Sequence, residues 1–149
     1  MLAQRAPKGG EPQALGRSRG GFSTKIHIAV DALGNPVDLL LTEGQAADNP
    51  QAKVLIEGKP SDHVIADKAY DANDTIKAIE DQGAIPVIPP KASRKNQREY
   101  DLALYRERHL VECFIGKIKH FRRLFSRFDK LQNRFLSFLQ FVSTLIWLR

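Results

Sequence analysis

The sequence predicts a domain of the α/β class, and three features of the chain support this prediction. Alternating apolar and polar residues at 24–30, a turn-rich connection and the apolar run 37–42 predict a β-hairpin. Two further short apolar runs, 63–67 and 84–88, enclose a helical segment and predict a β-α-β unit with parallel strands. The third feature is an amphipathic helix at 101–123.

The size and composition of the chain suit one soluble domain with its own core. Of its 149 residues, 42% are hydrophobic and 27% are charged. The net charge of +6 favours an anionic partner, of which nucleic acid is the commonest. A basic protein without such a partner has the same composition, so charge alone does not decide between the two.

The sequence contains no recognisable secretion signal, membrane anchor or disulfide framework. Residues 1–21 lack the apolar core of a signal peptide. The apolar stretch 135–148 is too short and too often interrupted by polar residues to span a bilayer, so it is predicted to be a core helix. Cys113 is the single cysteine, which fits a reducing compartment. We therefore expect a cytoplasmic protein that does not enter a membrane.

The N-terminal segment 1–21 differs in composition from the rest of the chain. It is rich in Gly, Pro, Lys and Arg and has no hydrophobic period, which predicts a flexible, basic, linker-like segment ahead of a domain at 22–149. A polar tail is the alternative reading. Because the initiator Met opens directly into linker-like sequence, we expect that structure is missing upstream.

Two helices are predicted around the parallel strands, each with candidate caps. A short helix at 49–57 can begin at Asp48 or Asn49. The next, at 74–82, can be capped by Asp71 or Asn73 and stopped by Gly83.

Asp67 stands out because it ends the apolar run 63–67. A buried parallel strand commonly delivers a functional side chain from its carboxyl end into a crevice. Lys68 follows at once and adds a cation beside this acid.

A group of cations lies in the loop 91–98, which contains no apolar side chain larger than that of alanine. The loop is either a solvated connection or a surface that contacts phosphates, and the net charge slightly favours the second. Basic residues follow the amphipathic helix as well. The predicted DNA-binding residues are Lys68, Lys91, Arg94, Lys95, Arg98, Arg122 and Arg123.

The helix at 101–123, which can extend to Phe128, has two separate faces. At about 100° per residue, Tyr105, Arg108, Glu112 and Lys119 share a sector of roughly 60°. A carboxylate is thus held between cations beside a buried face, and a final helix is predicted at 131–148. The buried stripe is Leu104, Val111, Phe114, Ile115, Ile118 and Phe121.

Asp67 and Glu112 together suggest a metal site. Mg²⁺ prefers oxygen ligands, and two such ions about 3.5–4 Å apart support in-line displacement at phosphorus. Arg108 and Lys119 can neutralise phosphate charge, and Tyr105 can stack on a base. An ordinary ion pair between Glu112 and a neighbouring cation explains the pattern too, and it is the preferred reading on the pattern alone.

A family resemblance changes that preference. It rests on GRSRGGFSTKIH (16–27), VDALGNP (30–36), ADKAYDAN (66–73) and the spacing Tyr105-x2-Arg108-x3-Glu112-x6-Lys119, in this order over nearly the whole chain. The last of these resembles a Y-R-E-K signature around a catalytic Glu. On these residues the chain resembles the catalytic part of bacterial insertion-sequence transposases of the DDE type, specifically the insertion-sequence-five family.

The resemblance implies a ribonuclease H-like fold, a mixed sheet flanked by helices with a helical C-terminus. It implies that Asp67 and Glu112 are two of three carboxylates that bind Mg²⁺ or Mn²⁺. In such enzymes water attacks the end of the element to free a 3′-hydroxyl, and that hydroxyl attacks target DNA. The expected partners are therefore DNA at the element ends and at the target.

The chain departs from the family pattern at its N-terminal side. The family's first catalytic Asp lies on a strand before the segment that resembles 16–27, and no residue of 1–24 supplies it. That strand is expected to be central, so its absence leaves two strand edges unpaired. We expect a C-terminal part, either the downstream frame of a frameshifted element or the remnant of a truncated copy.

Three readings of the function remain open. The first is a transposase catalytic part that works as a homo-oligomer, with the upstream-frame product or a full-length transposase as a further partner. The second is a non-catalytic regulator or remnant that binds DNA or a transposase. The third, an unrelated basic α/β protein, requires the signature spacing to be coincidence.

Overall fold

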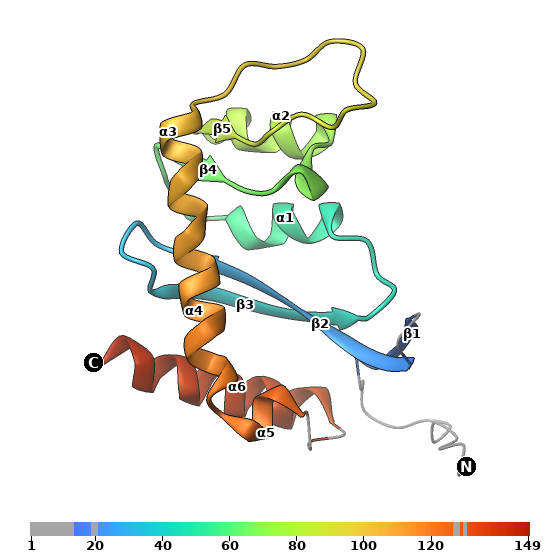
Figure 1. Ribbon diagram of the computed structural model, residues 1–149, viewed down its shortest axis with the longest axis vertical. Coiled ribbons are helices and arrows are strands. Elements are labelled where there is room, and N and C mark those ends of the chain that lie inside the picture. Colours follow the sequence, from blue (N-terminus) through green and yellow to red (C-terminus); the bar gives the residue numbers. More distant parts are fainter. Residues whose placement is uncertain (1–13, 19–20, 127–128, 130) are drawn as a thin grey trace.

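A computed structural model describes residues 14–18, 21–126, 129 and 131–149 of the chain. It contains two small sheets and a set of helices, and so confirms the α/β class (Figure 1). The first sheet is antiparallel, with the strand order β1-β2-β3. Its strands are β1 (Gly16–Ser18), β2 (Gly21–Val30) and β3 (Pro36–Glu43).

The predicted hairpin is present as β2 and β3. Their register runs from Thr24 opposite Glu43 to Val30 opposite Pro36. The turn is held by Asp31, whose Oδ1 accepts the N–H groups of Leu33 and Asn35, each at 2.9 Å. The predicted hairpin and its turn are therefore confirmed, with Asp31 holding the turn.

Strand β1 was not foreseen, because three residues are too few to show a period. It pairs with the start of β2, with Gly16 opposite Ser23. The part of the predicted linker that lies in 14–18 therefore joins the first sheet. Residues 1–13 and 19–20 of that segment lie outside the described residues.

The second sheet confirms the β-α-β prediction. Strands β4 (His63–Ile65) and β5 (Ile85–Val87) are parallel. The connection between them is formed by the 3₁₀ turn η1 (Lys68–Tyr70) and helix α2 (Asn73–Asp81). Helix α1 (Asn49–Ile56) precedes β4 at the predicted place.

The predicted cap of α1 is confirmed in position but not as a side-chain cap, and the predicted cap of α2 is wrong. Asp48 occupies the cap position of α1, but its carboxylate pairs with Lys25 Nζ at 2.9 Å. The cap residue of α2 is Ala72, with no side-chain cap bond, and Asp71 is buried. Each of the two carboxylates, of Asp48 and of Asp71, thus pairs with a cation distant in sequence instead of capping a helix.

The single helix expected at 101–123 is divided. Helix α3 (Leu102–Tyr105), the turn η2 (Arg106–Arg108) and helix α4 (His109–Lys119) follow one another, and α5 (Arg122–Phe125) is a separate turn of helix. Phe121 has φ −87° and ψ 94°, which ends the helical path. The break lets Leu124, only 5% exposed, pack into the core. The expected extension to Phe128 lies outside the described residues.

The last helix, α6 (Gln132–Trp147), confirms the prediction for 131–148 to within a residue at each end. Its apolar face joins that of α4 and β3 in one cluster, so α6 is a core helix. No helix in the described ranges is both long and apolar enough to span a bilayer. The buried cluster consists of Leu41, Phe114, Ile118, Leu124, Phe135, Leu139 and Val142.

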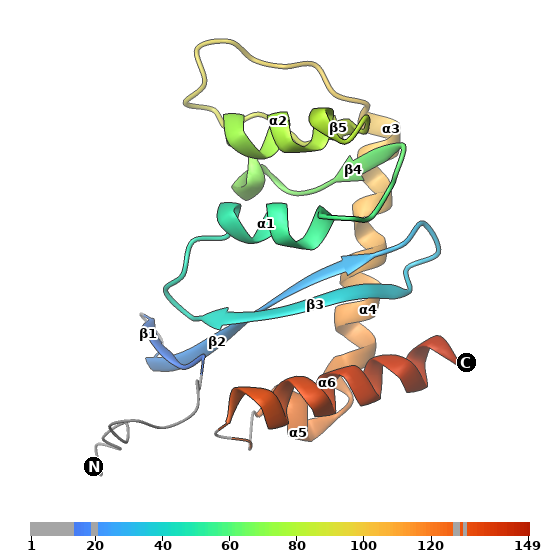
Figure 2. The same cartoon turned by 180° about the vertical axis from the view of Figure 1, so that it is seen from behind.

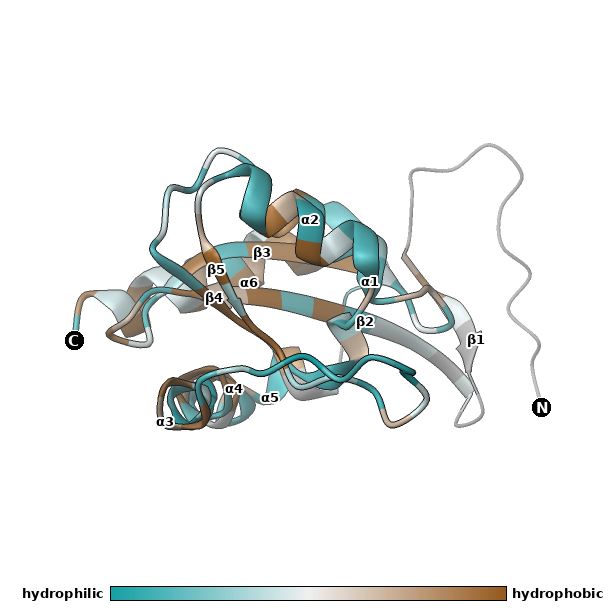
Figure 3. Cartoon of the chain, turned by 90° about the horizontal axis from the view of Figure 1, so that it is seen from above, coloured by the Kyte–Doolittle hydropathy of each residue, from teal (hydrophilic) through white to brown (hydrophobic). Residues whose placement is uncertain are grey.

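The helices lie on two sides of the strands. From above, α1 and α2 lie on one side and α3 and α4 on the other (Figure 3). Helix α4 contacts β2 while α3 contacts β5, so this run of helix crosses both sheets (Figures 1 and 2). A second buried cluster joins α2 to the parallel strands through Ile76, Ile79, Ala84 and Ile88.

The single mixed sheet expected from the family resemblance is not formed by the described residues. They form two sheets with no ladder between them. Within the described part, β2 pairs only with β3 over 24–30, and β4 pairs only with β5. Each sheet therefore has an edge strand that offers backbone groups for further pairing.

Candidate functional site

Asp67 is positioned by the end of β4. The chain leaves the strand in an extended conformation, φ −77° and ψ 170°, and Asp67 then begins η1. Its Oδ1 accepts the N–H of Ala69 at 2.8 Å, which fixes the carboxylate at the start of the turn. No described residue donates a hydrogen bond to Oδ2, so one oxygen remains available for a ligand.

Glu112 is held by Arg108, one turn earlier along the helix. Arg108 Nη2 donates to Glu112 Oε1 at 2.6 Å, and the Glu112 side chain is 57% exposed. The Arg108 guanidinium also lies over the ring of Tyr105, 5.9 Å from its centroid, and Tyr105 meets Tyr100 edge to face. Three of the four signature residues are therefore in contact.

The strand-end acid and this helix face lie within electrostatic reach of each other. Partial burial works to lower the pKa of Arg108, but the hydrogen bond with Glu112 and the charges of Glu112, Tyr105 and Asp67 outweigh it and raise that pKa. Burial, with the charges of Asp48 and Asp67, raises the pKa of Tyr70 to about 12. The charge of Asp67 thus acts on Arg108, the hydrogen-bond partner of Glu112.

Lys119 lies at the far end of α4, two turns beyond Glu112. It is exposed and lines a cavity of about 420 Å³ between β2 and α4. Ile26 and Ile118 line the same cavity. The structure brings Tyr105, Arg108 and Glu112 together, whereas Lys119 is set apart from their contact.

The donor set fits a hard divalent cation but is small. Carboxylate oxygens, as in Asp67 and Glu112, are the ligands that Mg²⁺ and Mn²⁺ prefer. Across the part of the chain that the structure describes, no group of three or more His, Cys, Asp or Glu side chains is close enough to hold a metal.

The predicted DNA-binding residues divide into two groups. Arg94 and Arg98 pair with the buried Asp71, and Arg123 donates to both oxygens of Asp129 at 2.9 and 2.8 Å. The hydrogen bond with Asp129, followed by its charge, raises the pKa of Arg123. The remaining cations are exposed, except that Lys91 is partly buried; they are Lys68, Lys91, Lys95 and Arg122.

The sequence indicated only a helix-capping role for Asp71 and did not predict that its carboxylate is buried and paired with two arginines. Its partners lie 20 to 27 residues further along the chain, a separation that no helical or strand period reveals. The only signal was the coincidence of an acid after a short strand and a basic loop after the next one.

The Arg108–Glu112 pair is expected to contribute little to stability. Both side chains keep substantial solvent contact, 35% and 57% exposed, so Arg108→Ala is expected to lower the free energy of unfolding by under about 0.5 kcal/mol. Urea unfolding checks this, with Lys53→Ala, in an exposed pair with Asp74, as the matched control. A loss well above 1 kcal/mol would assign Arg108 a structural role.

Comparison with known proteins identifies the family. The model of the family described as "Transposase DDE domain" matches residues 3–145. A putative transposase for insertion sequence element IS6501 of Brucella ovis is 40% identical over 131 residues, 86% of this chain and 100% of that protein. A putative transposase for insertion sequence element IS402 of Burkholderia cepacia is 32% identical over 152 residues, 94% of this chain and 68% of that protein.

No solved structure matches the chain. The family model covers nearly the whole chain, including the segment before β2 and the helices that carry the Tyr105–Arg108–Glu112 contact. The chain therefore belongs to the transposase DDE domain family.

Proposed function

We propose that this chain is the catalytic part of an insertion-sequence transposase, which cleaves DNA at the element ends and joins them to target DNA. The observation that carries the proposal is the contact of Tyr105, Arg108 and Glu112 on the signature face. The charge of the strand-end Asp67 also acts on this face through Arg108. Family membership and two relatives named as putative transposases support it. The signature spacing supports the insertion-sequence-five subtype.

In this proposal Asp67 and Glu112 hold Mg²⁺ or Mn²⁺. The bound metal supplies stabilisation of the charge that develops on the reacting phosphate. Asp67 presents Oδ2, because Oδ1 is engaged by Ala69. Arg108 fixes Oε1 of Glu112 and leaves Oε2 to the metal. Tyr105 supports Arg108 from the other side.

The third carboxylate comes from outside the described residues in this proposal. It lies on a strand between β2 and β4, which joins the two sheets into a ribonuclease H-like mixed sheet. The edge of β2 that faces away from β3 over residues 24–30 and the outer edge of β4 have no ladder among the described residues, which supports this arrangement. An upstream-frame product or a full-length transposase, within a homo-oligomer on DNA, is the partner that fits.

Metal binding tests the assignment independently of activity. Mn²⁺ binding to the purified full chain, followed by electron paramagnetic resonance, is expected to weaken at least about tenfold in Asp67→Asn and in Glu112→Gln, because loss of a metal ligand costs no less than loss of an outer-shell partner. Glu107→Gln, on the neighbouring turn η2, is the matched control and is expected to bind like the wild type.

Transposition tests the reaction itself. When the chain acts together with full-length transposase on DNA that carries the element ends, strand transfer is expected to disappear in the Glu112→Gln form of both proteins. Strand transfer that survives this change would refute the assignment of Glu112.

A non-catalytic regulator is the second candidate, and it is favoured because no three His, Cys, Asp or Glu side chains form a metal-binding group among the described residues. In that case the Asp67→Ala/Glu112→Ala double variant inhibits transposition by a full-length transposase as strongly as the unmodified chain does. Metal-dependent nicking of plasmid DNA by this chain alone would argue against the regulator.

A further inference from the structure

Asp71 is a buried carboxylate that lies four residues after Asp67. Its side chain has no solvent contact. A buried carboxylate is costly unless charge and hydrogen bonds compensate it. Burial works to raise the pKa of Asp71, but hydrogen bonds from Arg94 and Lys91 and the charges of Arg98 and Arg94 outweigh it and lower that pKa. Asp71 is therefore ionised at neutral pH.

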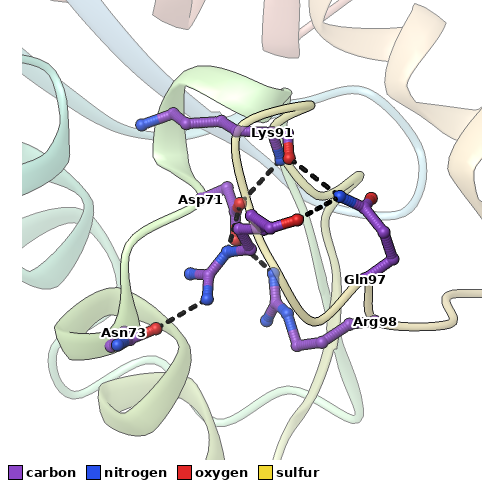
Figure 4. A network of polar contacts seen from close by, with 6 residues as sticks. Asp71, Asn73, Lys91, Gln97 and Arg98 are labelled. Carbon is purple, nitrogen blue, oxygen red and sulfur yellow. Dashed lines mark hydrogen bonds and ion pairs between the residues drawn. The ribbon is translucent and has the colours of Figure 1, made fainter.

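All the partners of this carboxylate come from the basic loop 91–98. The Lys91 N–H donates to Oδ2 at 2.8 Å, and Arg94 Nε donates to the same oxygen at 2.6 Å. Arg98 Nη2 donates to Oδ1 (Figure 4). One acid thus binds both ends and the middle of the loop.

The loop is also closed on itself and tied to α2. Gln97 Nε2 donates to the carbonyls of Lys91 and Arg94, at 3.2 and 2.9 Å. Arg94 Nη1 donates to Asn73 Oδ1 at 2.7 Å. A segment without helix or strand therefore has a defined shape.

The same short stretch of chain holds the loop and the candidate catalytic acid. Asp67 begins the turn η1, and Asp71 ends it, with its N–H donating to the carbonyl of Lys68. One turn of 3₁₀ helix therefore separates Asp67 from Asp71, the residue that binds the loop. Side chains that leave the loop are positioned relative to Asp67.

We propose that Asp71 is a positioning residue, which uses Arg94 and Arg98 to anchor the loop 91–98 so that Lys91 and Lys95 meet DNA phosphates at a fixed place beside Asp67. The Lys91 side chain extends away from the Asp71 carboxylate (Figure 4), and Lys95 is exposed. In this proposal Arg94 and Arg98 hold the loop through Asp71, whereas Lys91 and Lys95 bind the DNA phosphates. This inference rests on the DNA-binding part of the proposed function.

DNA affinity distinguishes the proposed positioning role of Asp71 from a simple effect of its negative charge on DNA binding. Asp71→Asn makes the protein more positive, which by charge alone strengthens binding to a short fluorescein-labelled duplex. Positioning predicts the opposite sign, an affinity lowered about three- to tenfold, since a fixed array of cations is lost. Asp74→Asn, the same change at an 86% exposed position of α2, is the matched control and is expected to bind as well as the wild type or better. Unchanged or stronger binding by Asp71→Asn would overturn the proposal.

Limited proteolysis measures, in the absence of DNA, how firmly Asp71 holds the loop 91–98. Tryptic cleavage after Lys91, Arg94 and Lys95 is expected to become at least about tenfold faster in Asp71→Asn, because the local opening free energy falls. Unchanged cleavage rates would refute the proposal that Asp71 anchors the loop. If the wild-type loop is protected from trypsin but the wild type binds no DNA, the DNA-binding part of the proposed function is refuted, whereas the anchoring of the loop by Asp71 is not.

Three milder variants cover the case in which Asp71→Asn does not fold. Arg98 Nε is buried without an acceptor among the described residues, whereas Arg94 has both Asp71 and Asn73 as partners. Arg94→Gln is therefore expected to speed tryptic cleavage after Lys91 and Lys95, the sites that both variants keep, more than Arg98→Gln does. The reverse order would contradict the anchor as described. Lys95→Gln is expected to leave the loop protected and to lower the salt dependence of DNA binding by about one unit of slope.

Discussion

Phe114→Ala is expected to lower the free energy of unfolding by about 3–5 kcal/mol, the usual cost of removing a buried phenyl ring. Phe114 is 0% exposed and lies in the cluster that joins α4 to β3 and α6. Domains of this size are stable by only about 5–15 kcal/mol, so a large part of the total depends on this one side chain. Urea unfolding followed by circular dichroism measures the loss.

Phe141→Ala is the matched control for this prediction. Phe141 lies on α6 and is 58% exposed, so the same truncation leaves no comparable cavity there. We expect its effect to stay below about 1 kcal/mol. Equal losses for the two phenylalanines would mean that α4 does not join the sheet to α6 as described.

Asp71→Asn is expected to lower the free energy of unfolding by about 3 kcal/mol at neutral pH, near the lower end for breaking a buried ion pair. The lower end applies because Arg94 and Arg98 keep 23% and 29% exposure and regain water when the charge is lost. Removing the carboxylate also leaves the Lys91 N–H with a weaker acceptor.

The same variant has a defined pH dependence. The pKa of Asp71 is lowered in the folded protein, so its stabilising effect is fully present above the unfolded value of about 3.9 and is lost as the pH falls through the lower, folded value. The stability difference between wild type and Asp71→Asn is therefore expected to be constant from neutral pH to about pH 5 and to shrink below about pH 4. A difference that shrinks already between pH 7 and 5 would show that another group carries it.

Much of the fold could be predicted because its signals are local. The hairpin of β2 and β3, the parallel pair of β4 and β5, and α6 all follow from periods and turns within a few residues. The division of the helix after Lys119 could not be predicted. Residues 120–125 continue a helical pattern, and only the burial of Leu124 beside α6 makes the break favourable.

The candidate site was predicted in part for the same reason. The signature spacing placed Tyr105, Arg108 and Glu112 on one face, and the structure brings these three into contact. The catalytic roles of Asp67 and Glu112 stay predictions. Arg94, Arg98 and Arg123 were predicted to bind DNA from their charge alone, whereas the structure gives each of them an acidic partner.

The sequence by itself determined the α/β class, the hairpin, the parallel strand pair, the last helix, the family and the helix face that carries Glu112. Each of these depends on residues close together or on a fixed spacing. Only the tertiary structure decided which charges are neutralised inside the molecule and which face solvent. Asp71 shows the physical reason. A buried carboxylate is stable only when cations and hydrogen bonds compensate its charge, and the partners of Asp71 lie 20 to 27 residues away, on a loop that only the folded chain brings to it.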